Sequence, residues 1–305
     1  MRFSQAFKAR SLRWMPVFVL ICGVWFGAGK SFATEPDMSA VPLRAKYTEL
    51  EKRLRNNQFQ RALYLDSAQS SNDLKGEIYA VVDYPFTAVN SALNNPAHWC
   101  DVLVLHVNIK YCHASSNKVG TVLAVNLGRK YEQPIADAYR VEFNYREVIT
   151  TPDYFAVELN AKDGPLSTHD YRIQIEATPL KDGRTFLHFT YAYAFGLTGR
   201  LAMQGYLATI GRDKVGFTIT GKLPNDQPIY IQGVRGVVER NTMRYYLAID
   251  AYLAALTTPP KDQLEKRLQH WYKSTEQYAR QLHEVERNDY FEMKHNEYQR
   301  QQVAQ

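Results

Sequence analysis

Four side chains in the second half of the chain could supply a catalytic acid and base: His188, Asp213, Arg235 and Glu239. General acid–base catalysis requires two such groups that converge on one substrate within hydrogen-bond reach. No two of these residues show a spacing that this chemistry demands. The sequence therefore gives an enzyme little support, and a protein without catalytic activity is favoured.

Two cysteines and three histidines lie close together in the first half of the chain and could hold a metal ion. They are His98, Cys100, His106, Cys112 and His113. Zinc sites usually show spacings such as CxxC or HExxH, and none occurs among these residues. We therefore predict no metal site, and we expect no other cofactor.

Aromatic residues recur in a predicted strand at 185–195 and in a predicted helix at 234–256. Each tyrosine brings a hydroxyl that must find a partner when it is buried. A cavity with an apolar body and a few polar groups would provide that partner by binding an amphipathic ligand. The predicted lining residues are Phe189, Tyr191, Tyr193, Tyr245, Ile249 and Tyr252. The alternative is a solid core, in which the strand is covered on both faces.

Three glycines mark one apolar segment of the chain: Gly199, Gly205 and Gly211. Each would weaken a helix by about 1 kcal/mol relative to alanine. The segment could be a flexible gate over the cavity mouth, or the glycines could permit close packing against the sheet. Arg212 and Lys214, in the charged turn that follows, could contact an anionic head group or could be solvated.

Strands are the elements that must position most of these residues. Apolar and polar residues alternate in several segments separated by Pro, Asp and Gly turns, which is typical of half-buried antiparallel strands. The predicted strands lie at 62–66, 76–83, 103–109, 119–127, 139–145, 154–159, 171–177, 185–195 and 215–220. The sequence therefore predicts an antiparallel sheet with one face toward a core.

Helical periodicity appears on both sides of the strand-rich region. Residues 34–61 carry apolar side chains at helical spacing and predict an N-terminal amphipathic helix. The apolar stripe at 234–256 predicts a long helix that ends before Pro259 and Pro260. A second, polar helix is expected at 261–300, packed on the N-terminal helix or available to another protein.

The stretch 76–112 places three elements in a characteristic order: a strand, a segment that opens with Pro85-Phe86 and closes at Trp99, and a second strand. This order resembles the opening of START-related helix-grip domains, the SRPBCC or polyketide-cyclase-like superfamily. The resemblance implies an α+β fold in which a curved antiparallel sheet grips a long C-terminal helix.

The resemblance also divides the chain. The helix-grip domain would span 62–257, with the N-terminal helix at 34–61 before it and a C-terminal helical extension at 258–305 after it. Members of the superfamily include lipid and sterol carriers, cyclases and small-molecule sensors. The resemblance therefore implies a cavity for an apolar ligand without naming that ligand.

Residues 1–33 are predicted to be a secretory signal peptide. A basic n-region precedes an apolar run at 15–28, and Ser31-Phe32-Ala33 offers a cleavage site of the A-x-A type. The apolar run is shorter than the roughly 20 residues that span a bilayer. We expect export to the periplasm with cleavage after Ala33, and an uncleaved inner-membrane anchor is the alternative.

The leader also accounts for most of the net positive charge of the chain. The chain has 37 Lys and Arg against 31 Asp and Glu, and five of the basic residues precede Thr34. A nearly neutral mature chain lacks the field that attracts phosphates, so nucleic acid is excluded as a partner. Cleavage would leave only Cys100 and Cys112, and two cysteines in an oxidising compartment are expected to form a disulfide bond.

Three classes of function follow from these predictions. The favoured one is an exported carrier of a lipid or another apolar small molecule, with an internal cavity and transient membrane contact. The second is an envelope scaffold with a packed core, which holds a protein partner through its C-terminal helix. The third is an enzyme of the cyclase or hydrolase type in the same fold.

Overall fold

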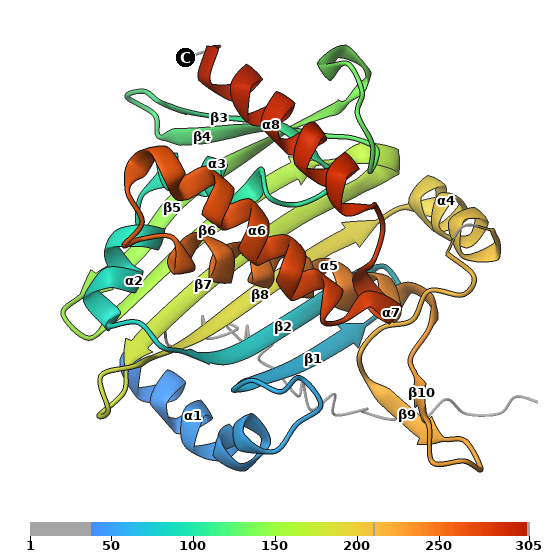
Figure 1. Cartoon of the computed structure of the whole chain (residues 1–305), viewed down its shortest axis with the longest axis horizontal. Coiled ribbons are helices and arrows are strands. Elements are labelled where there is room, and N and C mark those ends of the chain that lie inside the picture. Colours follow the sequence, from blue (N-terminus) through green and yellow to red (C-terminus); the bar gives the residue numbers. More distant parts are fainter. Residues whose placement is uncertain (1–37, 210, 304–305) are drawn as a thin grey trace, which may run out of the picture. The chain divides into compact units, whose positions relative to one another are not determined.

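The structure is a computed structural model that describes residues 38–209 and 211–303, so the predicted signal peptide at 1–33 lies outside the described residues. The described chain contains an eight-stranded antiparallel sheet in the order β1-β2-β8-β7-β6-β5-β4-β3 (Figure 1). The strands are β1 (Leu63–Gln69), β2 (Asp73–Val82), β3 (Ile109–Ser116), β4 (Thr121–Leu127), β5 (Tyr139–Thr151), β6 (Tyr154–Asp163), β7 (Thr168–Pro179) and β8 (Thr185–Phe195).

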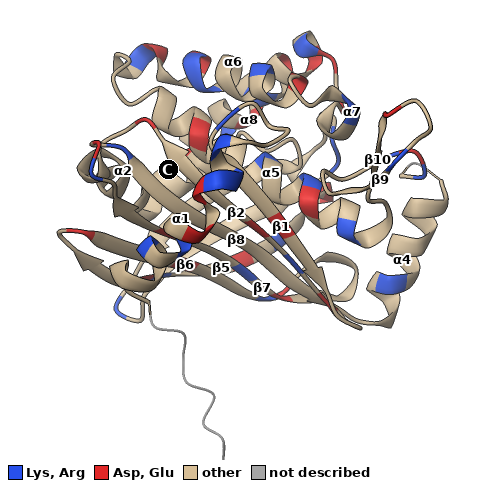
Figure 2. Cartoon of the chain, turned by 90° about the horizontal axis from the view of Figure 1, so that it is seen from below, with Lys and Arg blue, Asp and Glu red and all other residues tan. Residues whose placement is uncertain are grey.

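The helix α5 (Gly233–Ala254) lies along one face of this sheet, which we call the inner face. Ile78 of β2 and Phe189 of β8 are cross-strand partners on this face, and both are fully buried. Figure 2 shows the sheet curving beneath the helices that cover it. The predicted fold class, a curved antiparallel sheet that grips a long C-terminal helix, is confirmed.

The helix α1 (Ala40–Arg55) covers the opposite, outer face of the sheet. Its buried leucines, including Leu50, pack with Tyr79 of β2 and Phe186 of β8. Because side chains alternate across a strand, Phe186 points outward while Phe189 points inward. The absence of polar alternation in β8 therefore has a simple cause: this central strand is covered on both faces.

Two short helices, α2 (Phe86–Leu93) and α3 (Pro96–Leu103), connect β2 to β3. The Asn95 side chain accepts a hydrogen bond from the Ala97 amide at 3.0 Å and caps α3, with proline at the first helical position. The predicted strand at 103–109 is wrong, because α3 continues to Leu103 and β3 begins only at Ile109. An apolar run of this length fits a buried helix end and turn as well as a strand.

A disulfide bond joins α3 to β3. It links Cys100 to Cys112, whose Cα atoms are 5.2 Å apart, and the predicted pairing is confirmed. Cys112 is fully buried and Cys100 nearly so, so the bond lies within the core beside Trp99. It fixes the helix pair against the edge of the sheet.

The C-terminal extension consists of α6 (Gln263–Glu276), α7 (Ala279–Leu282) and α8 (Arg287–Val303), preceded by the short 3-10 helix η3 (Pro260–Asp262). The prediction of one continuous helix is therefore wrong. So is its packing on the N-terminal helix, since α6 packs on α5 and α8 on β3, whereas α1 covers the other face (Figure 1). Trp271 and Tyr290 stack at 4.8 Å and extend the core between α6 and α8.

The segment between β8 and α5 also departs from the prediction. After α4 (Leu197–Ala208), the expected strand at 215–220 is not part of the main sheet. Instead β9 (Ile219–Lys222) pairs with β10 (Pro228–Tyr230) in a separate two-stranded ribbon. No described helix has both the length and the apolar character needed to span a bilayer.

His188 lies on the outer face of β8 between two carboxylates. Its Nδ1 is 2.7 Å from Glu176 Oε1 on β7, and its Nε2 is 3.0 Å from Glu77 Oε1 on β2. Tyr79 stacks on the imidazole with ring centroids 4.1 Å apart, and Lys46 of α1 lies over the Tyr79 ring. The ring thus ties three adjacent strands together beneath α1.

These contacts shift the pKa values of His188 and Glu77. Burial alone would lower the pKa of His188, but the hydrogen bonds to Glu176 and Glu77 raise it above its ordinary value. Burial would raise the pKa of Glu77, but the hydrogen bonds from His188 and Lys75 lower it to about 2. The imidazolium form is therefore the one that the native state favours.

Replacing His188 should give a pH-dependent loss of stability. A raised pKa contributes its full stabilisation below the unfolded value of about 6.5 and loses it as pH rises through the folded value. We expect His188→Gln to lower the free energy of unfolding by about 1–3 kcal/mol at pH 6 and by much less at pH 9, measured by urea denaturation. The lowered pKa of Glu77 also stabilises the folded state: this contribution is present above about pH 4.5 and disappears as pH falls toward 2.

The matched control is His169→Gln, since the His169 side chain is 43% exposed and, among the described residues, bonds only Asp170 beside it. This variant should unfold like the wild type at both pH values. An equal loss of stability for His188→Gln at pH 6 and pH 9 would show that the imidazolium charge does not contribute.

Candidate functional site

The structure does not bring the four candidate catalytic residues together. His188 lies on the outer face of the sheet, and Asp213 is exposed in a turn. Only Arg235 and Glu239 of α5 approach each other, through hydrogen bonds to the same Ser67 hydroxyl. These side chains do not form an acid and base that converge on one substrate position.

Glu239 anchors a loop. Its fully buried carboxylate accepts hydrogen bonds from Ser67 Oγ at 2.6 Å, from the Phe217 amide at 2.6 Å and from the Thr218 amide at 2.9 Å. Gly216 is required beside it, because an added Cβ would lie 2.5 Å from Glu239 Oε2. With its oxygens occupied, this glutamate serves the fold.

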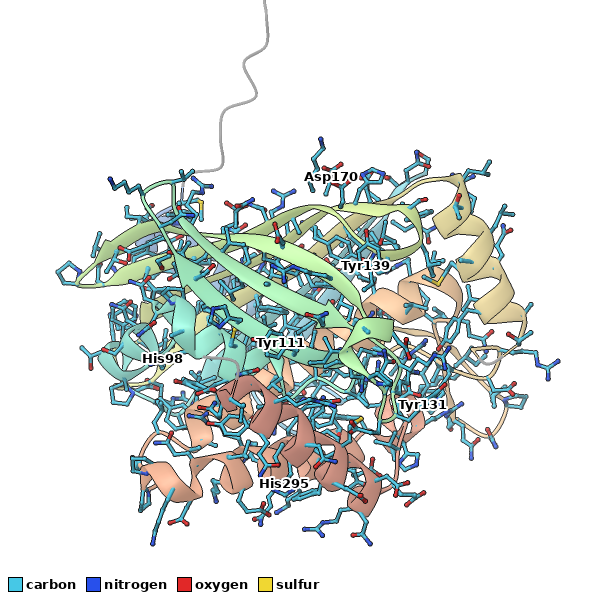
Figure 3. All side chains as sticks on the ribbon, turned by 90° about the horizontal axis from the view of Figure 1, so that it is seen from above. His98, Tyr111, Tyr131, Tyr139, Asp170 and His295 are labelled. Carbon is cyan, nitrogen blue, oxygen red and sulfur yellow. A yellow bond between two sulfur atoms is a disulfide. The ribbon has the colours of Figure 1, made fainter. Side chains whose placement is uncertain are left out.

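The histidines considered as metal ligands have separate surroundings. His98 of α3 (Figure 3) bonds the Ala92 carbonyl at 2.9 Å. His106, in the turn after α3, stacks on Tyr245 at 4.5 Å. Burial, together with nearby Arg244 and Lys294, holds the pKa of His106 well below its ordinary value, so the ring is neutral. Within the described residues, no three His, Cys, Asp or Glu side chains are grouped to hold a metal ion.

Four tyrosines form a continuous cluster on the inner face. Tyr171 stacks on Tyr193 at 5.3 Å, Tyr193 contacts Tyr191 at 5.6 Å, and Tyr191 contacts Tyr245 at 5.1 Å. Tyr171 donates its hydroxyl to Thr168. In the described part of the chain, the hydroxyls of the other three tyrosines have no hydrogen-bond partner, although these residues are buried. Burial raises the pKa of Tyr193, so its hydroxyl stays protonated.

The other predicted lining residues lie elsewhere along α5 and the sheet. Phe189 and Ile249 are fully buried in the apolar core. Tyr252 faces α3 and α6, where its ring lies 5.7 Å from His98 and 4.3 Å from the Arg267 guanidinium carbon. The six predicted residues therefore do not line one cavity, and Tyr193 is the one of them that borders the pocket described next.

A pocket of about 240 Å³ opens between α4, the β1–β2 turn, β8 and the start of α5. Leu74, Phe195, Met203 and Val234 form its apolar part. The remaining lining residues, which are mostly polar, are Gln69, Ser70, Ser71, Thr168, Tyr193, Gly199, Arg200 and Gln204. The pocket therefore combines an apolar body with several polar groups, which is the composition of a small-molecule site.

The three glycines of the predicted gate have different surroundings. An added Cβ at Gly199 would lie 2.9 Å from the Leu166 carbonyl oxygen, and one at Gly211 would lie 2.3 Å from the Tyr206 ring. At Gly205 it would meet nothing within 4 Å. Gly199 and Gly211 thus permit close packing around α4, whereas Gly205 has no steric role. Motion of this segment stays a prediction.

A cluster of charges beneath α4 was not foreseen as a group. Glu284 is 2.7 Å from Arg244 and from Lys130 and 3.2 Å from Lys214. Burial would raise the pKa of Glu284, but Arg244 and Lys130 lower it to about 2. Lys214 also donates to the His283 carbonyl, while Arg212 is exposed. Arginine inside the apolar stripe of the predicted helix at 234–256 was the sequence signal for this cluster.

A second buried charge cluster joins α8 to β3 and to the turn before it. Lys110 and Lys294 share Glu297, at 2.9 and 2.6 Å, and all three are almost completely buried. Burial, partly offset by Glu297, lowers the pKa of Lys294 to about 8. Lys294 also donates to the His106 and Ile109 carbonyls. The cluster satisfies the backbone of this turn and attaches the last helix to the sheet edge.

No protein-family model matches the chain, and no curated protein matches it. Several solved structures do. Ara h 8.0201 matches with a TM-score of 0.33 and 11% identity over 63% of this chain and 97% of its own. A norcoclaurine synthase from Thalictrum flavum, crystallised with a transition-state analogue, matches with a TM-score of 0.32 and 16% identity over 47% of this chain and 93% of its own.

Human StAR-related lipid transfer protein 5 matches with a TM-score of 0.32 and 8% identity, over 55% of this chain and 89% of its own. We draw no inference about family, ligand or activity from these likenesses. The fold assignment rests on the strand order and on the position of α5 in this chain.

Two glycine substitutions should separate close packing from helix propensity in α4. Gly205→Ala should raise the free energy of unfolding by up to about 1 kcal/mol, because alanine favours the helix and the new methyl group meets no neighbour. Gly199→Ala should lower it by about 1–3 kcal/mol, because the methyl group collides with the backbone of Leu166. Thermal denaturation of the two variants measures both effects, and a stabilised Gly199→Ala would contradict the packing interpretation.

Proposed function

We propose that this protein binds a small amphipathic molecule, such as a single-chain lipid, in the pocket beneath α4. The observation that carries the proposal is the pocket of about 240 Å³ bordered by Tyr193, a buried residue whose hydroxyl makes no hydrogen bond to the described residues. A ligand with an apolar body and a polar group would fill the apolar wall and bond the hydroxyl.

The size of the pocket supports a small ligand. Ligand sites generally enclose about 300–1,000 Å³, and this pocket of about 240 Å³ lies below that range. It is too small to enclose both chains of a phospholipid. A single acyl chain or a compact apolar molecule therefore fits it better than a membrane lipid.

A carrier is supported more than an enzyme of the cyclase or hydrolase type. Glu239 and His188, the strongest acid–base candidates, have their polar atoms engaged in contacts that hold the fold together. A scaffold with a packed core is the second candidate, and the complete burial of Phe189 and Ile249 at the contact between α5 and the sheet favours it.

Export to the periplasm is part of the proposal. The basic n-region, the short apolar run and the Ser31-Phe32-Ala33 site support cleavage, and a buried disulfide bond suits an oxidising compartment. N-terminal sequencing of the protein isolated from cell envelopes should begin near Thr34. Recovery of Met1 on a membrane-bound form would favour the uncleaved anchor instead.

Filling the pocket tests the binding proposal. Met203 lines the pocket and Leu201, on the same helix, is 59% exposed. Met203→Trp should therefore weaken binding of a fluorescent single-chain fatty acid by at least about tenfold at little cost in melting temperature, because the indole occupies the ligand volume. The control Leu201→Trp, which adds the same ring to the solvent side, should bind like the wild type.

The wild-type measurement decides between the two candidates. The protein is first stripped of endogenous lipid and then titrated with the fluorescent probe. If it binds none at micromolar concentration, the carrier proposal fails and the scaffold proposal replaces it.

A further inference from the structure

Arg240 of α5 is a buried cation without a carboxylate partner among the described residues. It is 2% exposed. Its Nη1 donates to the Val215 carbonyl at 3.2 Å, and its Nη2 lies 3.5 Å from the Tyr206 hydroxyl of α4. Both are neutral acceptors, and the second bond is at the limit of hydrogen-bond length.

An unpaired guanidinium at this depth is costly. Moving a charge from water into a protein interior is strongly unfavourable, and buried charges are normally compensated by an opposite charge. Arg267, which is about as buried, shows the usual arrangement, since it lies 2.8 Å from Asp101. Arg240 departs from this rule.

The nearby carboxylates are already occupied. Glu284 forms three ion pairs: its Oε1 bonds Arg244, and its Oε2 bonds Lys130 and Lys214. Glu239 precedes Arg240 in the sequence, and its carboxylate already accepts hydrogen bonds from Ser67, Phe217 and Thr218. Arg235 bonds the same Ser67.

Arg240 lies beside the charge cluster around Glu284, since burial and the charge of Arg240 both lower the pKa of Arg244, which bonds Glu284. Among the described residues, Arg244, Lys130 and Lys214 are ion-paired with that carboxylate, and Arg240 is not. A negative charge beside Arg240 would therefore be favoured on two grounds: it would pair the unmatched guanidinium, and it would reduce the local excess of positive charge.

Arg240 is close to the pocket. Tyr206, which it contacts, lies on α4 next to the pocket-lining residues Met203 and Gln204. Burial raises the pKa of Tyr193 on the pocket wall, and the charge of Arg240 acts in the opposite direction, so the guanidinium lies within electrostatic reach of this hydroxyl. A ligand head group at Tyr193 would experience the same charge.

We propose that the ligand is an anion: Arg240 binds the carboxylate or phosphate head group of an amphipathic molecule whose apolar part occupies the pocket beneath α4. This inference rests on the proposed function. The planar guanidinium donates two parallel hydrogen bonds to either group, which makes arginine the preferred residue for them. The long contact to Tyr206 is the one that the head group replaces.

The test compares ligands that differ only in the head group. Wild-type protein is titrated with dodecanoate, dodecyl phosphate and dodecanol in competition with a fluorescent probe. We expect at least one of the two anions to bind about tenfold or more tightly than the neutral alcohol, as a charge-assisted hydrogen bond predicts. Which anion binds better distinguishes a carboxylate from a phosphate ligand.

Variants of the arginines locate the effect. Arg240→Gln should remove the preference for the anion while dodecanol still binds within about threefold of the wild type. Arg240→Lys, which keeps the charge, should retain part of the preference and serves if the glutamine variant does not fold. The control Arg267→Gln, which removes a buried arginine near α3, should leave the preference unchanged.

The outcomes separate this inference from the proposed function. If no ligand binds, the proposed function fails. If anions and alcohol bind equally, the pocket stands and the anion inference fails. Loss of the preference in Arg200→Gln but not in either Arg240 variant would move the anion to the exposed Arg200 at the pocket wall, and would overturn the role of Arg240.

Discussion

The ladder between β2 and β8 is the constraint on which the rest of the structure depends. It pairs Asp73 with Ala194 and continues to Val82 with Thr185, so it joins segments more than 100 residues apart. Because β1 pairs with the other edge of β2 and β7 with the other edge of β8, this ladder joins two sets of hairpins into one broad curved sheet with a long inner face. Only such a face can bury the whole of α5, and the pocket lies where β8 ends and α4 begins.

Buried carboxylates hold the irregular segments in place around that framework. Glu239 binds the amides of the loop before β9, Glu284 gathers three cations beneath α4, and Glu297 pairs two lysines under α8. Each satisfies polar groups that a loop buries when it crosses the core. Arg240 is the exception to this pattern, and it is next to the helix that covers the pocket.

The two faces of the sheet have different roles. On the outer face, α1 and the His188 cluster cover the central strands with aromatic and ionic contacts and leave β8 no solvent side. On the inner face, the tyrosine cluster combines apolar packing with three hydroxyls, those of Tyr191, Tyr193 and Tyr245, that have no hydrogen-bond partner among the described residues. A face that is fully satisfied serves stability, whereas a face with unmatched polar groups is suited to binding.

The sequence by itself determined an antiparallel sheet with flanking helices, the long helix that became α5 and the disulfide bond between Cys100 and Cys112, while the helix-grip arrangement followed from the resemblance of residues 76–112 to START-related domains. Strand alternation, apolar periodicity and cysteine number can be read from the sequence without knowing which residues are in contact. The tertiary structure alone decided that α6 and α8 pack on the inner side away from α1, that α3 ends at Leu103 with a turn before β3, and that Arg240 lacks a carboxylate partner among the described residues. These features depend on which distant side chains meet, because an apolar run fits either a helix or a strand, and a charge is paired only through neighbours that folding brings to it.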